Sequence, residues 1–148
     1  MKRWLSGLLV VLALSTSCLA DEEFLEPQDA FRFSARLVSG QLLEVHYHVA
    51  QGYYMYRDRF RFETEPHSVE LGEARFPEGE WHDDEYFGRS EIFRGEVNIR
   101  IPIVSDPGQT GTFRLVATSQ GCADEGICYL PTRQTIEFES LGIGGEGR

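Results

Sequence analysis

The sequence predicts an all-β protein, an immunoglobulin-like antiparallel β-sandwich, and three observations support that fold class. Apolar and polar residues alternate with a period of two in several short segments between residues 31 and 138. Turn-forming residues separate these segments at intervals of about 8–12 residues. Beyond residue 28 no segment has a convincing helical period.

The alternation identifies the strands in chain order, because every second side chain of a strand points to the same face. The expected inward-facing sets are Phe31, Phe33 and Ala35; Leu43, Val45, Tyr47 and Val49; Val97, Ile99, Ile101 and Ile103; Phe113, Leu115 and Ala117; and Ile136 and Phe138. Gly- and Pro-rich turns are predicted at 39–40, 51–52, 77–79 and 106–108. We expect roughly seven to nine strands in all, and Pro102 indicates an edge strand or a bulge.

Residues 1–20 have the layout of a secretory signal peptide. Lys2 and Arg3 precede an apolar run over 5–14, which is followed by small residues up to an expected cut after Ala20. An alternative makes Cys18 the lipidated first residue of a lipoprotein, but the residues before it lack the expected large aliphatic one. Residues 21–140 are then one domain by size, and the Gly-rich stretch 141–148 is a tail that frays.

The charge balance is strongly acidic. The sequence holds 14 Lys and Arg residues against 24 Asp and Glu residues. Loss of Lys2 and Arg3 with the leader leaves 12 Arg and a formal net charge of −12. This charge repels nucleic acid and anionic membrane surfaces, so neither is an expected partner. After leader removal no segment is apolar enough to span a membrane.

Cys122 and Cys128 are the only cysteines expected to remain in the exported chain. Such a pair is either an inert staple or a thiol–disulfide couple. As a staple it closes a loop of seven residues, worth about 2–2.5 kcal/mol. The enclosed residues 123–126 are small and polar, which predicts a bridge on an exposed turn between two strands and open to a partner's thiolate.

Two aromatic stretches accompany the cysteines. Residues 81–90 combine three consecutive acids with Trp81, Tyr86 and Phe87 and have no two-fold period. They form either an aromatic-tipped functional loop or part of the core. In the stretch 52–57, Tyr54 and Tyr56 share one strand face, for which core packing is the default interpretation.

Together the residues Gly121–Tyr129 with Pro131, the stretch Trp81–Ile92 and the stretch Gly52–Arg57 resemble the N-terminal periplasmic domain of the DsbD family, the transmembrane thiol:disulfide interchange proteins of Gram-negative bacteria. The resemblance runs from about residue 24 to 138. It implies an immunoglobulin-like fold in which Cys128 forms mixed disulfides with partners and Cys122 resolves them. It further implies a cap loop and two lining tyrosines around the disulfide: Asp84, Glu85, Tyr86, Phe87, Gly88, Tyr54 and Tyr56.

The resemblance also implies partners and a compartment. Electrons would come from a thioredoxin-like donor domain and pass to periplasmic disulfide isomerases or cytochrome c maturation thioredoxins, with no cofactor. The family protein continues into a membrane domain and a thioredoxin-like domain, whereas this sequence stops at Arg148. It is therefore a stand-alone carrier or a fragment, with its donor on another polypeptide. The two cap aromatics occur as Tyr86 followed by Phe87, which is the reverse of their order in a known member of the family.

Carboxylates near the cysteines predict slow thiols. Asp124 and Glu125 lie between the cysteines, and Asp84 and Glu85 join them if the cap packs over the bridge. Negative charge raises the pKa of a thiol. We therefore expect slow reaction with small reagents and dependence on a partner that opens the cap.

Two other classes of function remain as alternatives. One is a non-catalytic secreted binding module with a structural disulfide. The other is a metal site of Cys122, Cys128, His46 and His48, although the cysteine spacing is longer than that of zinc sites. His67 and His82 are expected at the surface.

Overall fold

The computed structural model describes residues 24–39, 41–65, 67, 69–104 and 112–139. The predicted leader, the predicted turn at 106–108 and the predicted tail lie outside these residues. In chain order the elements are α1 (Pro27–Ala30), β1 (Phe31–Ser39), β2 (Leu42–Val49), β3 (Tyr53–Tyr56), the 3-10 turn η1 (Arg57–Arg59), β4 (Arg61–Glu65), β5 (Glu80–Asp84), β6 (Gly88–Phe93), β7 (Glu96–Pro102), β8 (Thr112–Ser119), β9 (Gly121–Ala123) and β10 (Thr132–Glu139).

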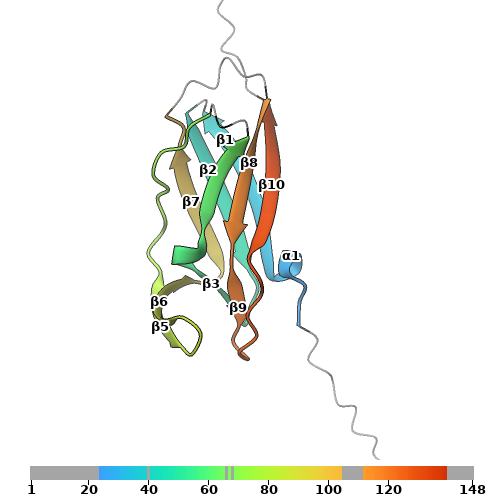
Figure 1. The fold of residues 1–148 in the computed structure, drawn as a ribbon, viewed down its shortest axis with the longest axis vertical. Helices are drawn as coiled ribbons and strands as arrows, with labels where there is room; N and C mark the ends of the chain where they lie inside the picture. Colours follow the sequence, from blue (N-terminus) through green and yellow to red (C-terminus); the bar gives the residue numbers. More distant parts are fainter. Residues whose placement is uncertain (1–23, 40, 66, 68, 105–111, 140–148) are drawn as a thin grey trace, which may run out of the picture.

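The described strands form three antiparallel sheets. Two three-stranded sheets, in the orders β1-β2-β7 and β10-β8-β4, run along the long axis of the molecule (Figure 1). A four-stranded sheet in the order β5-β6-β3-β9 lies at the lower end of that view. This all-β antiparallel architecture confirms the predicted fold class.

The main core lies between the two long sheets because each presents its apolar face inward. In β2 burial alternates strictly, with Leu43, Val45, Tyr47 and Val49 buried. The predicted inward residues of β7 and β8 are buried too. Pro102 ends β7, an edge strand of its sheet, as its missing N–H requires.

Three features differ from the expectation. The described residues form ten strands, β1 to β10, where roughly seven to nine were expected. Residues 80–93 form a β-hairpin of β5 and β6 and not an irregular loop. Its pairs are mostly polar, as at Asp83 opposite Arg89 and His82 opposite Ser90, so apolar alternation gives no strand signal there. Short helical turns, α1 and η1, also occur. Within the described ranges, no helix has the length and apolar character needed to cross a membrane.

Candidate thiol–disulfide site

The disulfide sits on β9 at the end of the molecule that carries the four-stranded sheet. Cys122 lies opposite Tyr54 of β3, and the chain then turns back so that Cys128 faces Cys122. The two sulfurs are 2.04 Å apart. Gly121 lets β9 pack closely against β3 and the Phe31 ring, because a Cβ there would lie 2.4 Å from the Tyr54 carbonyl oxygen and 2.5 Å from the Phe31 ring.

The two cysteines differ in accessibility. Cys122 is fully buried, with 0% of its surface exposed, whereas Cys128 is only half-buried. The turn between them exposes Asp124 and Glu125. The predicted exposed bridge is therefore wrong for Cys122, because Tyr54, Tyr56 and Ile92 pack around its sulfur.

Strand β3 separates the main core from the site. Tyr53 and Met55 pack into the main core, whereas Tyr54 and Tyr56 form a small separate cluster with Cys122. The predicted sharing of one strand face by Tyr54 and Tyr56 is thus confirmed, and their rings meet edge to face at 5.4 Å. Packing in the main core, the default interpretation for this strand, applies only to Tyr53 and Met55 on the opposite face.

A chain of hydroxyl contacts links this cluster to the cap. The Tyr56 hydroxyl donates to Asp84 Oδ2 at 2.7 Å and lies 3.4 Å from the Tyr54 hydroxyl. It also lies 3.4 Å from Cys122 Sγ. Because the bridged sulfur carries no hydrogen and the Tyr56 proton points to Asp84, this last approach is a van der Waals contact. Burial, followed by the hydrogen bonds to Tyr54 and Asp84, raises the pKa of Tyr56, which stays a neutral donor.

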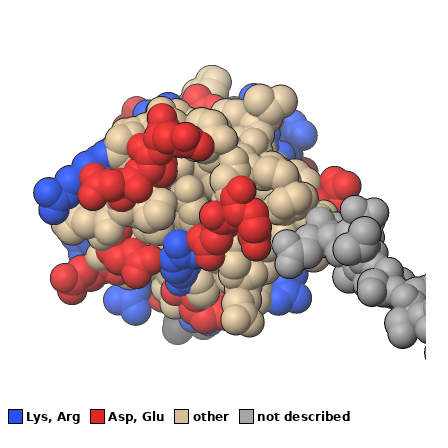
Figure 2. Space-filling view, turned by 90° about the horizontal axis from the view of Figure 1, so that it is seen from below, with Lys and Arg blue, Asp and Glu red and all other residues tan. Residues whose placement is uncertain are grey.

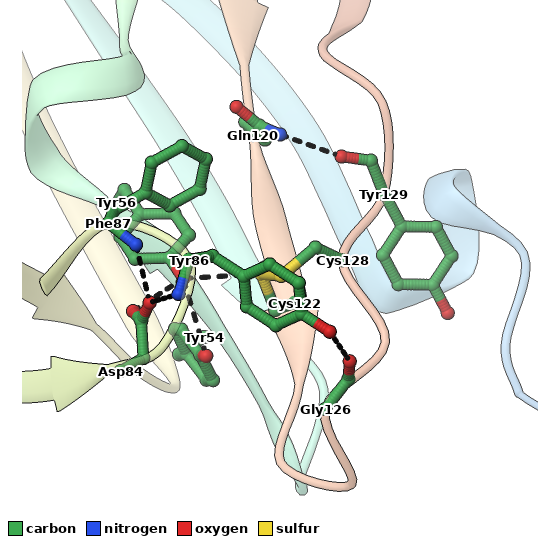
Figure 3. Close-up of a disulfide and its surroundings, with 10 residues drawn as sticks. All are labelled: Tyr54, Tyr56, Asp84, Tyr86, Phe87, Gln120, Cys122, Gly126, Cys128 and Tyr129. Atoms are coloured by element: carbon green, nitrogen blue, oxygen red, sulfur yellow. Dashed lines mark hydrogen bonds between the residues drawn. A yellow bond between two sulfur atoms is a disulfide. The ribbon is translucent and has the colours of Figure 1, made fainter.

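The predicted cap, Asp84–Gly88, forms the turn of the β5–β6 hairpin (Figure 3). Asp84 Oδ1 accepts the backbone N–H groups of Tyr86 and Phe87, each at 2.8 Å. Gly88 closes the turn with a φ of +67°, which favours glycine. Burial raises the pKa of Asp84, but the hydrogen bonds from Tyr56 and from the Phe87 and Tyr86 backbone outweigh it and leave the pKa below its ordinary value.

Both cap aromatics are anchored at the site. The Phe87 ring packs edge-on against Tyr56 at 4.8 Å, and the Arg59 guanidinium lies over it at 4.2 Å. The Tyr86 hydroxyl donates to the Gly126 carbonyl at 2.7 Å (Figure 3). Tyr86 is nevertheless 52% exposed and Trp81 66% exposed, so the alternative that these rings fill the core is wrong.

Sequence reasoning missed two arginines that brace the site. Arg59 holds Phe87, and Arg94 joins Asp124 at 2.8 Å to Glu80 at 2.7 Å. Arg94 also donates to the Tyr53 carbonyl and lies over the Tyr54 ring. Neither position stands out among the arginines of the sequence. His82, expected at the surface, is half-buried against Tyr54, whereas His67 is exposed as expected.

Acidic side chains gather at this end of the molecule (Figure 2). Asp83, Glu85, Asp124 and Glu125 are exposed there, and the charge of Asp124 is paired with Arg94. Negative charge around the half-buried Cys128 disfavours a thiolate. Because both cysteines are bonded here, the raised thiol pKa stays a prediction.

The histidine pair of the metal alternative lies on a strand of the β1-β2-β7 sheet, whereas Cys122 lies on β9 of the four-stranded sheet. His46 and His48 lie on β2 and contact Glu96 of β7, His46 with a separation of 2.5 Å. Among the described residues no group of three or more His, Cys, Asp or Glu is arranged to hold a metal ion. The structure therefore does not assemble the cysteines and histidines into the alternative metal site.

Fold and site together define an immunoglobulin-like domain with a capped, half-accessible disulfide at one end. Residues 21–140 match the family described as "Thiol:disulfide interchange protein DsbD, N-terminal". The chain belongs to this family of DsbD N-terminal domains.

Relatives extend the comparison. The chain is 40% identical over 116 residues to thiol:disulfide interchange protein DsbD 1 of Pseudomonas aeruginosa, covering 78% of this chain and 19% of that protein. It is 36% identical over 143 residues to DsbD of Ralstonia nicotianae, covering 94% and 23%. The chain thus spans about a fifth to a quarter of the length of these curated relatives.

Two solved structures from Neisseria meningitidis are similar. The reduced DsbD N-terminal domain has a TM-score of 0.71 at 32% identity, covering 78% of this chain and 89% of that one. The second structure is the complex between the DsbD N-terminal and PilB N-terminal domains. It has a TM-score of 0.64 at 33% identity and covers 82% of this chain and 91% of the matched one.

Proposed function

We propose that this domain, residues 21–140, carries reducing equivalents by thiol–disulfide exchange between a thioredoxin-like donor and thioredoxin-fold clients in the periplasm. The observation that carries the proposal is the capped disulfide in which one sulfur is buried and the other half-accessible. A structural staple needs no such asymmetry, whereas a carrier needs one sulfur that meets partners and one that stays with the domain. Membership of the DsbD N-terminal family supports the same chemistry.

The exchange balances between the two cysteines of the domain and a dithiol or disulfide of the partner. A donor thiolate attacks Cys128 Sγ, the bond to Cys122 breaks, and Cys122 leaves as a thiolate that takes up a proton. The donor's second thiol then attacks the donor's own bridging sulfur, which releases Cys128 and leaves the donor oxidised. In the client half-cycle the Cys128 thiolate attacks a client disulfide, and Cys122 attacks Cys128 Sγ to free the reduced client.

Partners follow from the same assignment. The donor is a thioredoxin-like domain, and the clients are periplasmic disulfide isomerases or cytochrome c maturation thioredoxins. A similar domain from Neisseria meningitidis has been solved in complex with the PilB N-terminal domain. The periplasmic location rests on a leader cut after Ala20.

The cap loop takes the role of a shield in this proposal. Asp84 holds the turn through three hydrogen bonds. Tyr86 and Phe87 extend from that turn, and Tyr54 and Tyr56 pack beside Cys122. Exposed Glu85 adds negative charge at the same end. A partner must displace this loop before a thiolate reaches Cys128.

Trapping tests the assignment. The Cys122→Ala variant, mixed with an oxidised thioredoxin-fold disulfide isomerase, should accumulate a dithiothreitol-sensitive adduct through Cys128, because the domain has lost the thiol that would release the reduced client. The matched Cys128→Ala variant should give little adduct because Cys122 is buried. Non-reducing electrophoresis with mass spectrometry measures both. Absence of adduct in both variants, with both folded, would favour a binding module with a structural disulfide.

A further inference from the structure

Tyr86 closes the cap onto the loop between the cysteines through its hydroxyl. The hydroxyl donates to the carbonyl of Gly126 at 2.7 Å. Gly126 lies two residues before Cys128 and has a φ of +90°. Its own N–H donates to the Ala123 carbonyl within the same turn.

The two ends of Tyr86 are therefore attached on different sides of the disulfide. Its backbone N–H is held by Asp84, whose other oxygen binds Tyr56 beside Cys122. Its hydroxyl is held on the Cys128 side by Gly126. Tyr86 consequently links the Asp84 anchor to the cysteine loop, and Figure 3 shows its ring drawn in front of the disulfide.

Apolar burial contributes little to this closure, because Tyr86 is 52% exposed. Phe87 differs: its ring packs on Tyr56 and under Arg59, all on the β3–η1 side. The Tyr86 hydroxyl thus joins the cap turn directly to the cysteine loop, through its hydrogen bond to the Gly126 carbonyl.

We propose that Tyr86 is a specificity-determining residue. Its hydrogen bond to Gly126 keeps the cap closed against small thiols, so that Cys128 reacts preferentially with protein partners that displace the cap. This inference rests on the proposed exchange function and adds the residue that selects among reductants. A small thiol reacts only with molecules whose cap has opened spontaneously, so its rate scales with the open fraction. A docked protein supplies binding free energy to open the cap, so its saturated rate depends less on that fraction.

The test compares reduction of the oxidised domain by glutathione in three variants at one pH. Tyr86→Phe removes only the hydroxyl, Tyr86→Ala removes hydroxyl and ring, and Tyr129→Phe is the matched control. Tyr129 also donates a hydroxyl hydrogen bond to a backbone carbonyl, that of Leu25 at 2.6 Å, but outside the cap. Loss of one hydrogen bond predicts a glutathione rate about 2- to 10-fold faster for Tyr86→Phe, an equal or faster rate for Tyr86→Ala, and no change for Tyr129→Phe.

A protein donor provides the second measurement. With a reduced thioredoxin-like donor at saturation, the rate for Tyr86→Phe should match that of the wild type. Because the glutathione rate rises, the ratio of the saturated donor rate to the glutathione rate declines. If Tyr86→Phe leaves the glutathione rate unchanged while Tyr86→Ala raises it, the ring shields the disulfide and the hydroxyl proposal is overturned. If wild type exchanges with no protein donor at all, the proposed function itself fails.

Discussion

Asp84 concentrates the control of the cap in a single carboxylate. It accepts the Tyr56 hydroxyl with one oxygen and two backbone N–H groups of the cap with the other. These bonds need the ionised form, which explains why the pKa of Asp84 lies below its ordinary value despite partial burial. The closed cap is therefore linked to the charge of Asp84.

We predict that acid opens the cap. Ionised Asp84 stabilises the closed cap, and this stabilisation is fully present at pH values above the ordinary aspartate pKa near 3.9. It is lost as the pH falls through the lower pKa that Asp84 has in the folded protein. Reduction by a phosphine, which works in acid, should therefore accelerate below about pH 4 relative to reduction of an unstructured disulfide peptide. Asp84→Asn should be reduced about 2- to 10-fold faster at neutral pH and lack the acid step. Asp83→Asn, at the exposed neighbouring acid, should behave as wild type.

At this scale the sequence located the residues carried by local motifs, and little beyond them. The structure joins Cys122 to Cys128, packs Tyr54 and Tyr56 beside Cys122, and bonds the cap turn to Tyr56 and Gly126, while the roles of these residues stay predictions. Arg59 and Arg94 could not be found, because their partners are distant in the sequence: the Arg94 bond to the Tyr53 carbonyl joins residues 41 positions apart. Nothing in the sequence distinguishes such an arginine from a solvated one.

Among the elements, β9 is short and depends on its neighbours. It has three residues, pairs only with β3 among the described strands, and carries Cys122. Arg94, the residue directly after β6, braces the turn that follows β9 through Asp124, while its other bonds reach Glu80 and the Tyr53 carbonyl. Burial lowers the pKa of Arg94, but the carboxylates of Asp124 and Glu80 outweigh it and raise the pKa above its ordinary value.

Arg94→Gln should increase local opening of the cysteine loop and should lower the free energy of unfolding only modestly. We expect faster amide hydrogen exchange at Ala123 and Gly126, whose N–H groups close the turn, and a loss of about 1–2 kcal/mol of unfolding free energy. Arg114→Gln, which breaks a looser contact to Glu65 at 3.4 Å on β8, is the matched control and should change stability by less than about 0.5 kcal/mol. Equal protection of Ala123 and Gly126 in both variants would contradict the bracing role.

Element prediction succeeded where one face of a strand meets the main core. The alternation in β2 and β7 appears directly as alternating burial, whereas in β8 it holds only up to Leu115, because Val116 is buried as well. It missed the β5–β6 hairpin because that hairpin is polar or exposed on most positions, and its strands are paired by backbone bonds that leave no apolar period. Periodicity detects burial, and this hairpin buries little besides Ile92 and Phe93.

At the scale of the whole molecule, the side chains around the disulfide and those of the main core form two separate packed clusters. The core holds residues from both long sheets, whereas Cys122 belongs to a small cluster with Tyr54, Tyr56 and Ile92. β3 is the shared wall, with alternate side chains facing each way. Reduction of the disulfide therefore leaves the packing of the main core largely unchanged. A carrier that is oxidised and reduced repeatedly needs a core that stays packed in both states.

This separation predicts a folded reduced form. Breaking a bridge that closes a seven-residue loop should cost about 2–2.5 kcal/mol of unfolding free energy. For a domain of this size the melting temperature should fall by roughly 5–15 °C. Far-ultraviolet circular dichroism at 25 °C should be unchanged, since the long sheets keep their core. The similar Neisseria meningitidis domain has been crystallised in the reduced form.

The Cys122→Ala/Cys128→Ala double variant separates loss of the bridge from the chemistry of free thiols and should melt close to the reduced wild type. Loss of the β-sheet spectrum in both would mean that the bridge holds the fold together, and the separation of site from core would be wrong.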